Sequence, residues 1–124
     1  RFAGAVEPMI DFYGLKNYNT CRKARNWLDT NGMANAFHDI REAGLDEVTV
    51  ADWSEQIGWE KLLNRKSTTW RNLPEGDKAD INKAKAVALM VAEPALIKRP
   101  VMVRSGKVTS GFDADVRSAL EAES

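Results

Sequence analysis

The sequence contains one sulfur nucleophile, Cys21, and one imidazole, that of His38. A lone thiol supports thiolate chemistry, in which the sulfur attacks a disulfide and an external thiol resolves the mixed disulfide. One cysteine forms no intramolecular disulfide, and with one histidine it does not supply the four ligands of a structural zinc site. We therefore expect thiol chemistry without a metal. A lone thiol also suits a reducing compartment, so we expect a cytoplasmic protein.

His38 is interpreted as a strand residue rather than a base. It lies next to Asp39 in an apolar run, and no serine or cysteine nucleophile is identifiably paired with it. Imidazole catalysis needs such a partner within hydrogen-bond reach, so we assign His38 no catalytic role.

Composition and charge exclude several classes of protein. Eighteen basic residues balance eighteen acidic ones, so no overall field favours nucleic acid or an anionic membrane, and direct nucleic-acid binding is not expected. No apolar run approaches the ~20 residues of a membrane helix. The 124 residues suffice for one domain with a core. We interpret residues 1–8 as a flexible leader or expression remnant and 9–124 as a single domain.

Cys21 is predicted to lie in the first turn of a helix between two strands. Asn19 and Thr20 are good N-cap residues, and Gly32 ends a helix readily. The flanking apolar runs predict parallel strands, because strands joined by a crossover helix run in the same direction. These three elements are expected over Met9–Tyr13, 21–31 and Ala36–Ile40.

The remainder predicts a helical segment, a β-hairpin and a final helix. Helix-forming residues dominate 45–97, and Pro94 ends the last of these helices. Ser105-Gly106 between two short runs predicts a tight hairpin. This order predicts an α/β fold with a mixed sheet. The expected elements are helices from Asp46 or Thr49 to Ile57, Trp59–Leu63 and Ala79–Val91, strands Val101–Arg104 and Lys107–Ser110, and a helix over Asp113–Glu121.

Six motifs, in order, resemble the arsenate reductase-like (ArsC/Spx/YffB) family, and the YffB-like branch most closely. The opening Tyr13–Leu28, YGLKNYNTCRKARNWL, is the most specific, and the resemblance runs from Met9 to about Arg117. It implies a thioredoxin-like fold with a helical insertion between the β-α-β start and the hairpin. It also implies glutathione-dependent thiol reduction. The other motifs are Phe37–Asp39, Gly58–Asn64, Ser67–Arg71, Ile97–Val101 and Gly111–Asp113.

The sequence departs from the family pattern at Tyr18. Members resembling this chain carry the nucleophilic cysteine at that position, and some carry a second cysteine three residues later, where this chain has Cys21. A tyrosine hydroxyl has no sulfur to exchange. The resemblance implies that Tyr18, with Asn19 and Thr20, lines the glutathione or substrate site. It implies further that Arg99, before a cis-proline at Pro100, stabilises a thiolate or anion.

Two interpretations of Cys21 stay open. The free N–H groups and positive dipole at a helix start favour a thiolate, and thus a nucleophile. Three residues along a helix, however, move the sulfur by roughly 4.5 Å and turn it toward the face of Ala24 and Leu28. Burial there raises a thiol pKa and blocks access.

A second anion site is implied by the resemblance at Arg65 and Lys66. Relatives place an arginine at Lys66, and Arg65 offers a guanidinium beside it that could hold a glutathione carboxylate or an oxyanion. The alternative is a solvated loop, and lysine does not replace arginine in bidentate binding. Plasmid-type arsenate reductases use a further arginine, whose position falls near Gly111 in this chain. Because that arginine is absent here, efficient arsenate reduction is not expected. The basic residues of the first helix are interpreted as solvated surface: Arg22, Lys23 and Arg25.

Two functions follow. The first is a glutathione-dependent thiol-disulfide reductase, in which Cys21 is the nucleophile, Arg99 stabilises its thiolate and Pro100 aligns the partner. Glutathione would be a co-substrate, and no cofactor would be bound. The alternative is a non-catalytic binding or regulatory module with a protein partner, resembling the Spx branch, which acts through contacts with RNA polymerase. The family pattern favours the first function, and Tyr18 favours the second.

Overall fold

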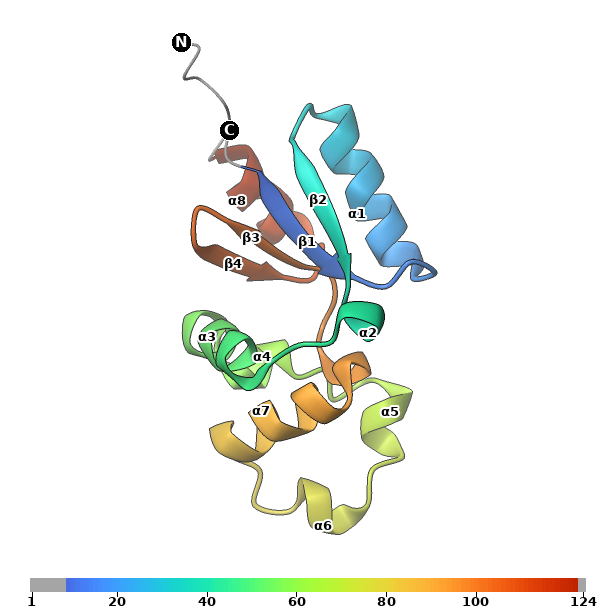
Figure 1. Cartoon of the computed structure of the whole chain (residues 1–124), viewed down its shortest axis with the longest axis vertical. Coiled ribbons are helices and arrows are strands. Elements are labelled where there is room, and N and C mark those ends of the chain that lie inside the picture. Colours follow the sequence, from blue (N-terminus) through green and yellow to red (C-terminus); the bar gives the residue numbers. More distant parts are fainter. Residues whose placement is uncertain (1–8, 123–124) are drawn as a thin grey trace. The chain divides into compact units, whose positions relative to one another are not determined.

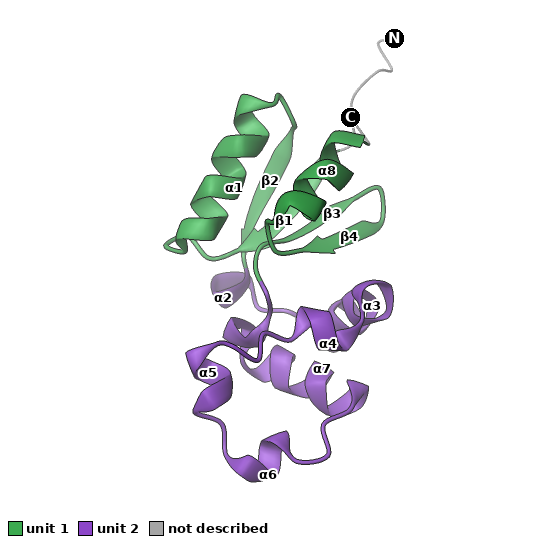
Figure 2. Cartoon of the chain, turned by 180° about the vertical axis from the view of Figure 1, so that it is seen from behind, with its two compact units in different colours: residues 1–39, 99–124 green, residues 40–98 purple. Residues whose placement is uncertain are grey.

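The computed structural model describes residues 9–122, which form two compact units (Figures 1 and 2). Unit 1 combines residues up to 39 with residues from 99 onward, and unit 2 comprises residues 40–98. The sequence prediction for residues 1–8 lies outside the described residues, and the single domain over 9–124 stays a prediction. No helix in residues 9–122 is long and apolar enough to cross a membrane.

Unit 1 is a mixed four-stranded sheet with two helices on one face, as Figure 2 shows. The strand order is β2-β1-β3-β4, with β1 parallel to β2 and antiparallel to β3, and β4 antiparallel to β3. The predicted α/β fold with a mixed sheet is therefore confirmed. The elements are β1 (Ile10–Gly14), α1 (Asn19–Thr30), β2 (Asn35–Asp39), β3 (Val101–Arg104), β4 (Lys107–Ser110) and α8 (Ala114–Ala122).

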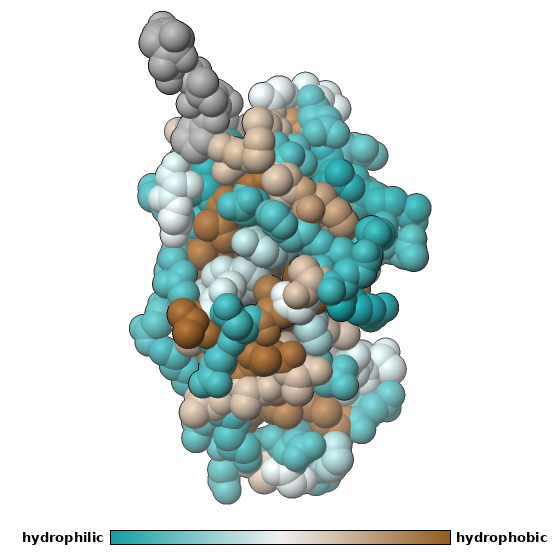
Figure 3. Space-filling view, in the orientation of Figure 1, coloured by the Kyte–Doolittle hydropathy of each residue, from teal (hydrophilic) through white to brown (hydrophobic). Residues whose placement is uncertain are grey.

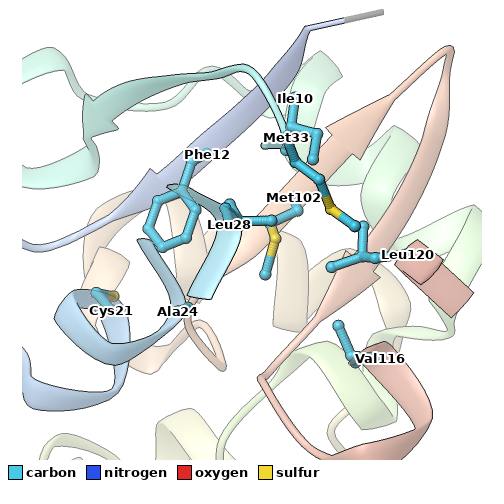
Figure 4. Close-up of a cluster of buried hydrophobic side chains, with 9 residues drawn as sticks. All are labelled: Ile10, Phe12, Cys21, Ala24, Leu28, Met33, Met102, Val116 and Leu120. Carbon is cyan, nitrogen blue, oxygen red and sulfur yellow. The ribbon is translucent and has the colours of Figure 1, made fainter. Parts of the chain in front are cut away.

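The core of unit 1 lies between the sheet and its two helices. Side chains alternate along a strand, so Ile10 and Phe12 of β1 are buried while Asp11 and Tyr13 are half-buried. On α1 the apolar spacing of three and four residues buries one stripe against the same face. Figure 4 shows the resulting cluster: Ile10, Phe12, Cys21, Ala24, Leu28, Met33, Met102, Val116 and Leu120.

Unit 2 is helical and corresponds to the predicted insertion. Its longest helices, α3 and α7, pack against each other around Val50, Trp53 and Met90. Asp46 caps α3 as expected, because its side chain accepts a hydrogen bond from the Thr49 N–H at 2.8 Å. The elements are α2 (Ile40–Ala43), α3 (Glu47–Ile57), α4 (Trp59–Leu62), α5 (Thr68–Arg71), α6 (Glu75–Lys78), α7 (Lys83–Ala92) and the 3₁₀ helix η1 (Pro94–Leu96).

The predicted cap of α1 is wrong. The helix already includes Asn19 and Thr20, and its N-cap is Tyr18, whose side chain makes no capping hydrogen bond. The side-chain oxygen of Asn19 instead accepts a hydrogen bond from Arg22 Nη2 at 2.6 Å. The side chain of Asn19, which was expected to cap the helix, therefore bonds to the side chain of Arg22 instead.

The predicted start of α7 is also wrong. The helix begins at Lys83 rather than at Ala79, and Asn82 caps it by accepting a hydrogen bond from the Lys85 N–H at 2.9 Å. Asp80 has a left-handed backbone, with φ of 52°. A residue in that conformation cannot continue a right-handed helix, so the helix starts only after it.

Candidate functional site

Tyr18 lies in the loop that joins β1 to α1 and forms the N-cap of the helix. Its backbone is extended, and its N–H donates a hydrogen bond to the carbonyl of Leu15 at 3.3 Å. Because Tyr18 contributes no capping side-chain bond, the first turn of α1 keeps N–H groups that a helix cannot satisfy internally. The loop thus presents an aromatic side chain at the positive end of the α1 dipole.

Arg99, two residues before β3, lies against the Tyr18 side chain of this loop. Its guanidinium carbon lies 4.7 Å from the centre of the Tyr18 ring, which is within the range of a cation–π contact. The peptide bond from Arg99 to Pro100 is cis, as the family pattern implies. The Nε and Nη1 atoms of Arg99 are buried and have no hydrogen-bond partner among the described residues. Donors that are buried without a partner are costly to the fold.

Cys21 lies in the core of unit 1, at one end of the cluster in Figure 4. Only 1% of its surface is exposed. A Cβ atom added to Gly14 would lie 2.6 Å from Cys21 Sγ and 3.2 Å from Phe12 Cε1. The sulfur therefore occupies space that only a glycine at the end of β1 leaves free.

The surroundings of Cys21 favour the protonated thiol. Burial raises the pKa of the Cys21 thiol above its ordinary value, and the negative charge of Asp39 acts in the same direction. A backbone hydrogen bond with Leu15 and the positive charges of Arg99 and Arg25 lower that pKa by less, so the net shift is upward. The balance of these effects therefore disfavours the thiolate.

The predicted site residues fall into two groups. Tyr18, Asn19, Thr20, Cys21, Arg99 and Pro100 all belong to unit 1. Pro100 is buried, and its carbonyl accepts a hydrogen bond from the Gly111 N–H at 2.9 Å. Asn19 is exposed and Thr20 is half-buried, both in the first turn of α1.

Arg65 and Lys66 belong to unit 2, between α4 and α5. The guanidinium carbon of Arg65 lies 5.4 Å from the centre of the Trp59 ring. The Lys66 N–H donates a hydrogen bond to Asn64 Oδ1 at 3.1 Å. Both side chains are exposed. Their membership of a glutathione or oxyanion site stays a prediction.

Comparison with known proteins identifies the family. The model of the ArsC family matches residues 13–120. The chain belongs to the ArsC family. Similar solved structures share this fold over nearly the whole chain. A YffB protein is 43% identical, with a TM-score of 0.84 over 89% of this chain and 96% of that chain. An arsenate reductase (ArsC) related protein from Brucella melitensis is 40% identical, with a TM-score of 0.74 over 94% of this chain and 95% of that chain.

Proteins similar to this chain include a transcriptional regulator. An uncharacterized protein of Haemophilus influenzae is 41% identical over 105 residues, which are 85% of this chain and 92% of the relative. The global transcriptional regulator Spx of Streptococcus mutans is 24% identical over 109 residues, which are 86% of this chain and 79% of that protein.

One side-chain cluster of this ArsC-family chain was missed by sequence reasoning. His38 Nε2 lies 3.1 Å from Asp11 Oδ1, and its ring stacks on that of Tyr13 at 4.8 Å between centroids. The partner of His38 is thus Asp11 on the neighbouring strand. The alternation of Asp11 and Tyr13 with buried residues was the signal that could have placed them on one face. Within residues 9–122 no group of three His, Cys, Asp or Glu side chains could hold a metal ion.

Proposed function

We propose that this ArsC-family chain is a redox-silent binding module, which acts through contacts with a partner rather than through thiol exchange. The observation that carries the proposal is the burial of Cys21, whose surface is 1% exposed and whose pKa burial raises. A nucleophilic thiol must be both accessible and ionised. The only sulfur nucleophile in the sequence is inaccessible, and its burial disfavours the ionised form.

The Tyr18 loop and Arg99 are the proposed contact site. Arg99 contributes a positive charge beside Tyr18, and a carboxylate gives the strongest hydrogen bond to a guanidinium. Tyr18 contributes an aromatic surface at the same place. Relatives named as transcriptional regulators support a function through contacts. A cytoplasmic location is part of this proposal.

A glutathione-dependent thiol-disulfide reductase is the second candidate. It is favoured by the charges of Arg99 and Arg25 and by the backbone hydrogen bond of Leu15, all of which lower the Cys21 pKa. In this candidate the Cys21 thiolate attacks one sulfur of a disulfide, and the other sulfur leaves as a thiolate. Glutathione then attacks the mixed disulfide and releases Cys21. The first turn of α1 must move away from the core for this attack, because Cys21 is buried in the structure.

In this second candidate the other predicted residues bind the co-substrate. Tyr18, Asn19, Thr20 and Pro100, all of unit 1, line the glutathione.

The alkylation rate of Cys21 as a function of pH, in native and unfolded protein, tests the proposal. We expect reaction only after unfolding, and no adduct after incubation of native protein with oxidised glutathione, as read by intact mass. A single glutathione adduct on native protein, with an alkylation midpoint below ~8.5, would establish the reductase candidate instead. Cys21→Ser provides the background for both measurements.

A further inference from the structure

The loop between β1 and α1, residues 15–18, is bonded to the end of the neighbouring strand β2. Its Lys16 N–H donates a hydrogen bond to Asp39 Oδ2 at 3.3 Å. Asp39 is the last residue of β2 and pairs in register with Gly14, the last residue of β1. Paired residues of neighbouring strands point to the same face of a sheet, so Asp39 lies on the face that carries the core of unit 1. The carboxylate thus joins β2 to the loop at the point where the loop leaves β1.

The start of this loop lies against Cys21. A backbone hydrogen bond joins Leu15 to the Cys21 thiol, and a Cβ atom at Gly14 would lie 2.6 Å from Cys21 Sγ. The backbone of these two residues therefore covers the sulfur, whose residue is 1% exposed. The bond to Asp39 is made by Lys16, the next residue along the chain. Movement of Lys16 away from Asp39 would therefore carry Leu15 away from the sulfur.

The same loop also positions Tyr18. The Tyr18 N–H donates a hydrogen bond to the Leu15 carbonyl at 3.3 Å, and the Tyr18 ring contacts the guanidinium of Arg99. Lys16 lies between the two residues of that turn, so its bond to β2 restricts where the turn can lie. The place of the Tyr18 ring is therefore linked to the covering of the sulfur.

The outer side of the loop is polar. Lys16 and Asn17 are exposed, and Figure 3 shows a hydrophilic surface at the right of the molecule, where the loop lies in Figure 1. Exposed polar groups stay hydrated when a loop moves, so opening costs little at this outer side. The contacts that resist opening are those on the inner side, including the bond to Asp39.

We propose that the Asp39 carboxylate is a latch that holds the β1–α1 loop closed over Cys21. The latch also keeps Tyr18 in place beside Arg99. The inference rests on the proposed function, because Tyr18 and Arg99 form the contact site of that function, and Asp39 is a positioning residue that acts on the site through the loop. Burial is the main cause that raises the pKa of the Cys21 thiol, and the negative charge of Asp39 acts in the same direction. Asp39 therefore helps to cover the sulfur and also disfavours its thiolate.

Alkylation of Cys21 in the folded protein tests the latch, because the buried sulfur reacts only when its cover opens. The rate is measured for the native chain, Asp39→Asn and Asp39→Ala, and each rate is divided by that of the same chain in denaturant. Both substitutions remove the charge, but asparagine keeps an oxygen that can accept from the Lys16 N–H. We expect Asp39→Ala to react roughly three- to tenfold faster than Asp39→Asn, the effect of one lost hydrogen bond. Equal rates in the two variants overturn the inference.

Asp113→Ala is the matched control, because it removes a carboxylate of unit 1 that also accepts one backbone hydrogen bond. Asp113 Oδ1 accepts from the Val116 N–H at 3.0 Å, at the start of α8. Urea unfolding compares the loss of global stability in this control with that in Asp39→Ala. The alkylation rate of Cys21 in the control should stay near the native value. An equal rise in the control would mean that global unfolding exposes the sulfur, and it would overturn the latch.

Hydrogen exchange at the Lys16 N–H gives a readout that needs no variant. This amide should exchange more slowly in the native chain than in the unfolded chain, and exchange at the unfolded rate overturns the inference. Protection should remain in Asp39→Asn and fall in Asp39→Ala. The proposed function fails separately, through a glutathione adduct on native Cys21. With native Cys21 unreactive, equal rates in the two Asp39 variants remove the latch alone.

Discussion

The guanidinium of Arg99 faces the ring of Tyr18, with 4.7 Å between the guanidinium carbon and the ring centre. The family resemblance implies a nucleophilic cysteine at the position of Tyr18, and Arg99 places a cation beside that point of the backbone. The N-terminus of α1 lies at the same place. Two of the features that ionise a thiol are therefore present around a residue that has no sulfur.

Tyr18→Cys in a Cys21→Ser background should consequently gain a reactive thiol. The charge of Arg99 and the helix dipole stabilise a thiolate, so we expect its pKa to fall below the ~8.5 of an ordinary cysteine. The measurement is the alkylation rate against pH, with adduct formation from oxidised glutathione. Adding Arg99→Gln should move the midpoint back upward. A midpoint at or above the ordinary value would show that the loop no longer activates a thiol.

Cys21 should make the stability of the protein depend on alkaline pH. Burial raises the pKa of Cys21 above its value in the unfolded chain, so the folded state holds the proton more tightly. That contribution is complete below the unfolded pKa and is lost as the pH rises through it toward the folded value. Thermal melts between about pH 7 and 10 should show a shrinking difference in Tm between the native chain and Cys21→Ala. A constant difference would mean that the buried thiol does not titrate.

Gly14→Ala should destabilise unit 1 by about 1–3 kcal/mol. The added methyl group would lie 2.6 Å from Cys21 Sγ, closer than real side-chain contacts allow, so the core must shift. Urea unfolding of the single and double variants measures the coupling. In a Cys21→Ala background the cost should be smaller, because the main clash is absent. Additive costs would argue that the two sites are independent.

Asn82, which caps α7, and Asn19, which does not cap α1, make a matched pair. Asn82→Ala removes the side chain that accepts from the Lys85 N–H, so we expect a loss of about 1 kcal/mol in the free energy of unfolding. Asn19→Ala should change that free energy little, because Asn19 bonds only to an exposed arginine side chain. Equal losses from the two substitutions would contradict the observed cap assignments.

Local patterns predicted most of the elements. The hairpin around Ser105-Gly106 has the predicted strands, because two residues with positive φ suffice to reverse a chain. The spacing of Cys21, Ala24 and Leu28 predicted the buried stripe of α1. The starts of helices were less predictable. Asn19, Thr20 and Asn82 all have side chains that can cap a helix, but only Asn82 does so, because the backbone conformation decides which residue is the N-cap.

The candidate site was only partly predictable from sequence. The reactivity of Cys21 depends on how deeply its thiol is buried and on the charges around it, such as those of Arg99 and Asp39, which local sequence patterns do not give. The contact of Tyr18 with Arg99 joins residues about eighty positions apart, and the family resemblance was the only guide to it. The pairing of His38 with Asp11 required the register of β1 against β2, which local patterns do not contain.

The sheet of unit 1 is assembled from two stretches of chain that residues 40–98 separate. During synthesis, β1 and β2 leave the ribosome together, whereas β3, the other neighbour of β1, follows only after the whole of unit 2. Closing so long a loop is entropically costly and slow, while unit 2 makes its contacts within one continuous segment. A nascent chain that ends before Val101 therefore carries an unpaired edge on its central strand. That edge is open to pairing with other chains until translation delivers its native neighbour.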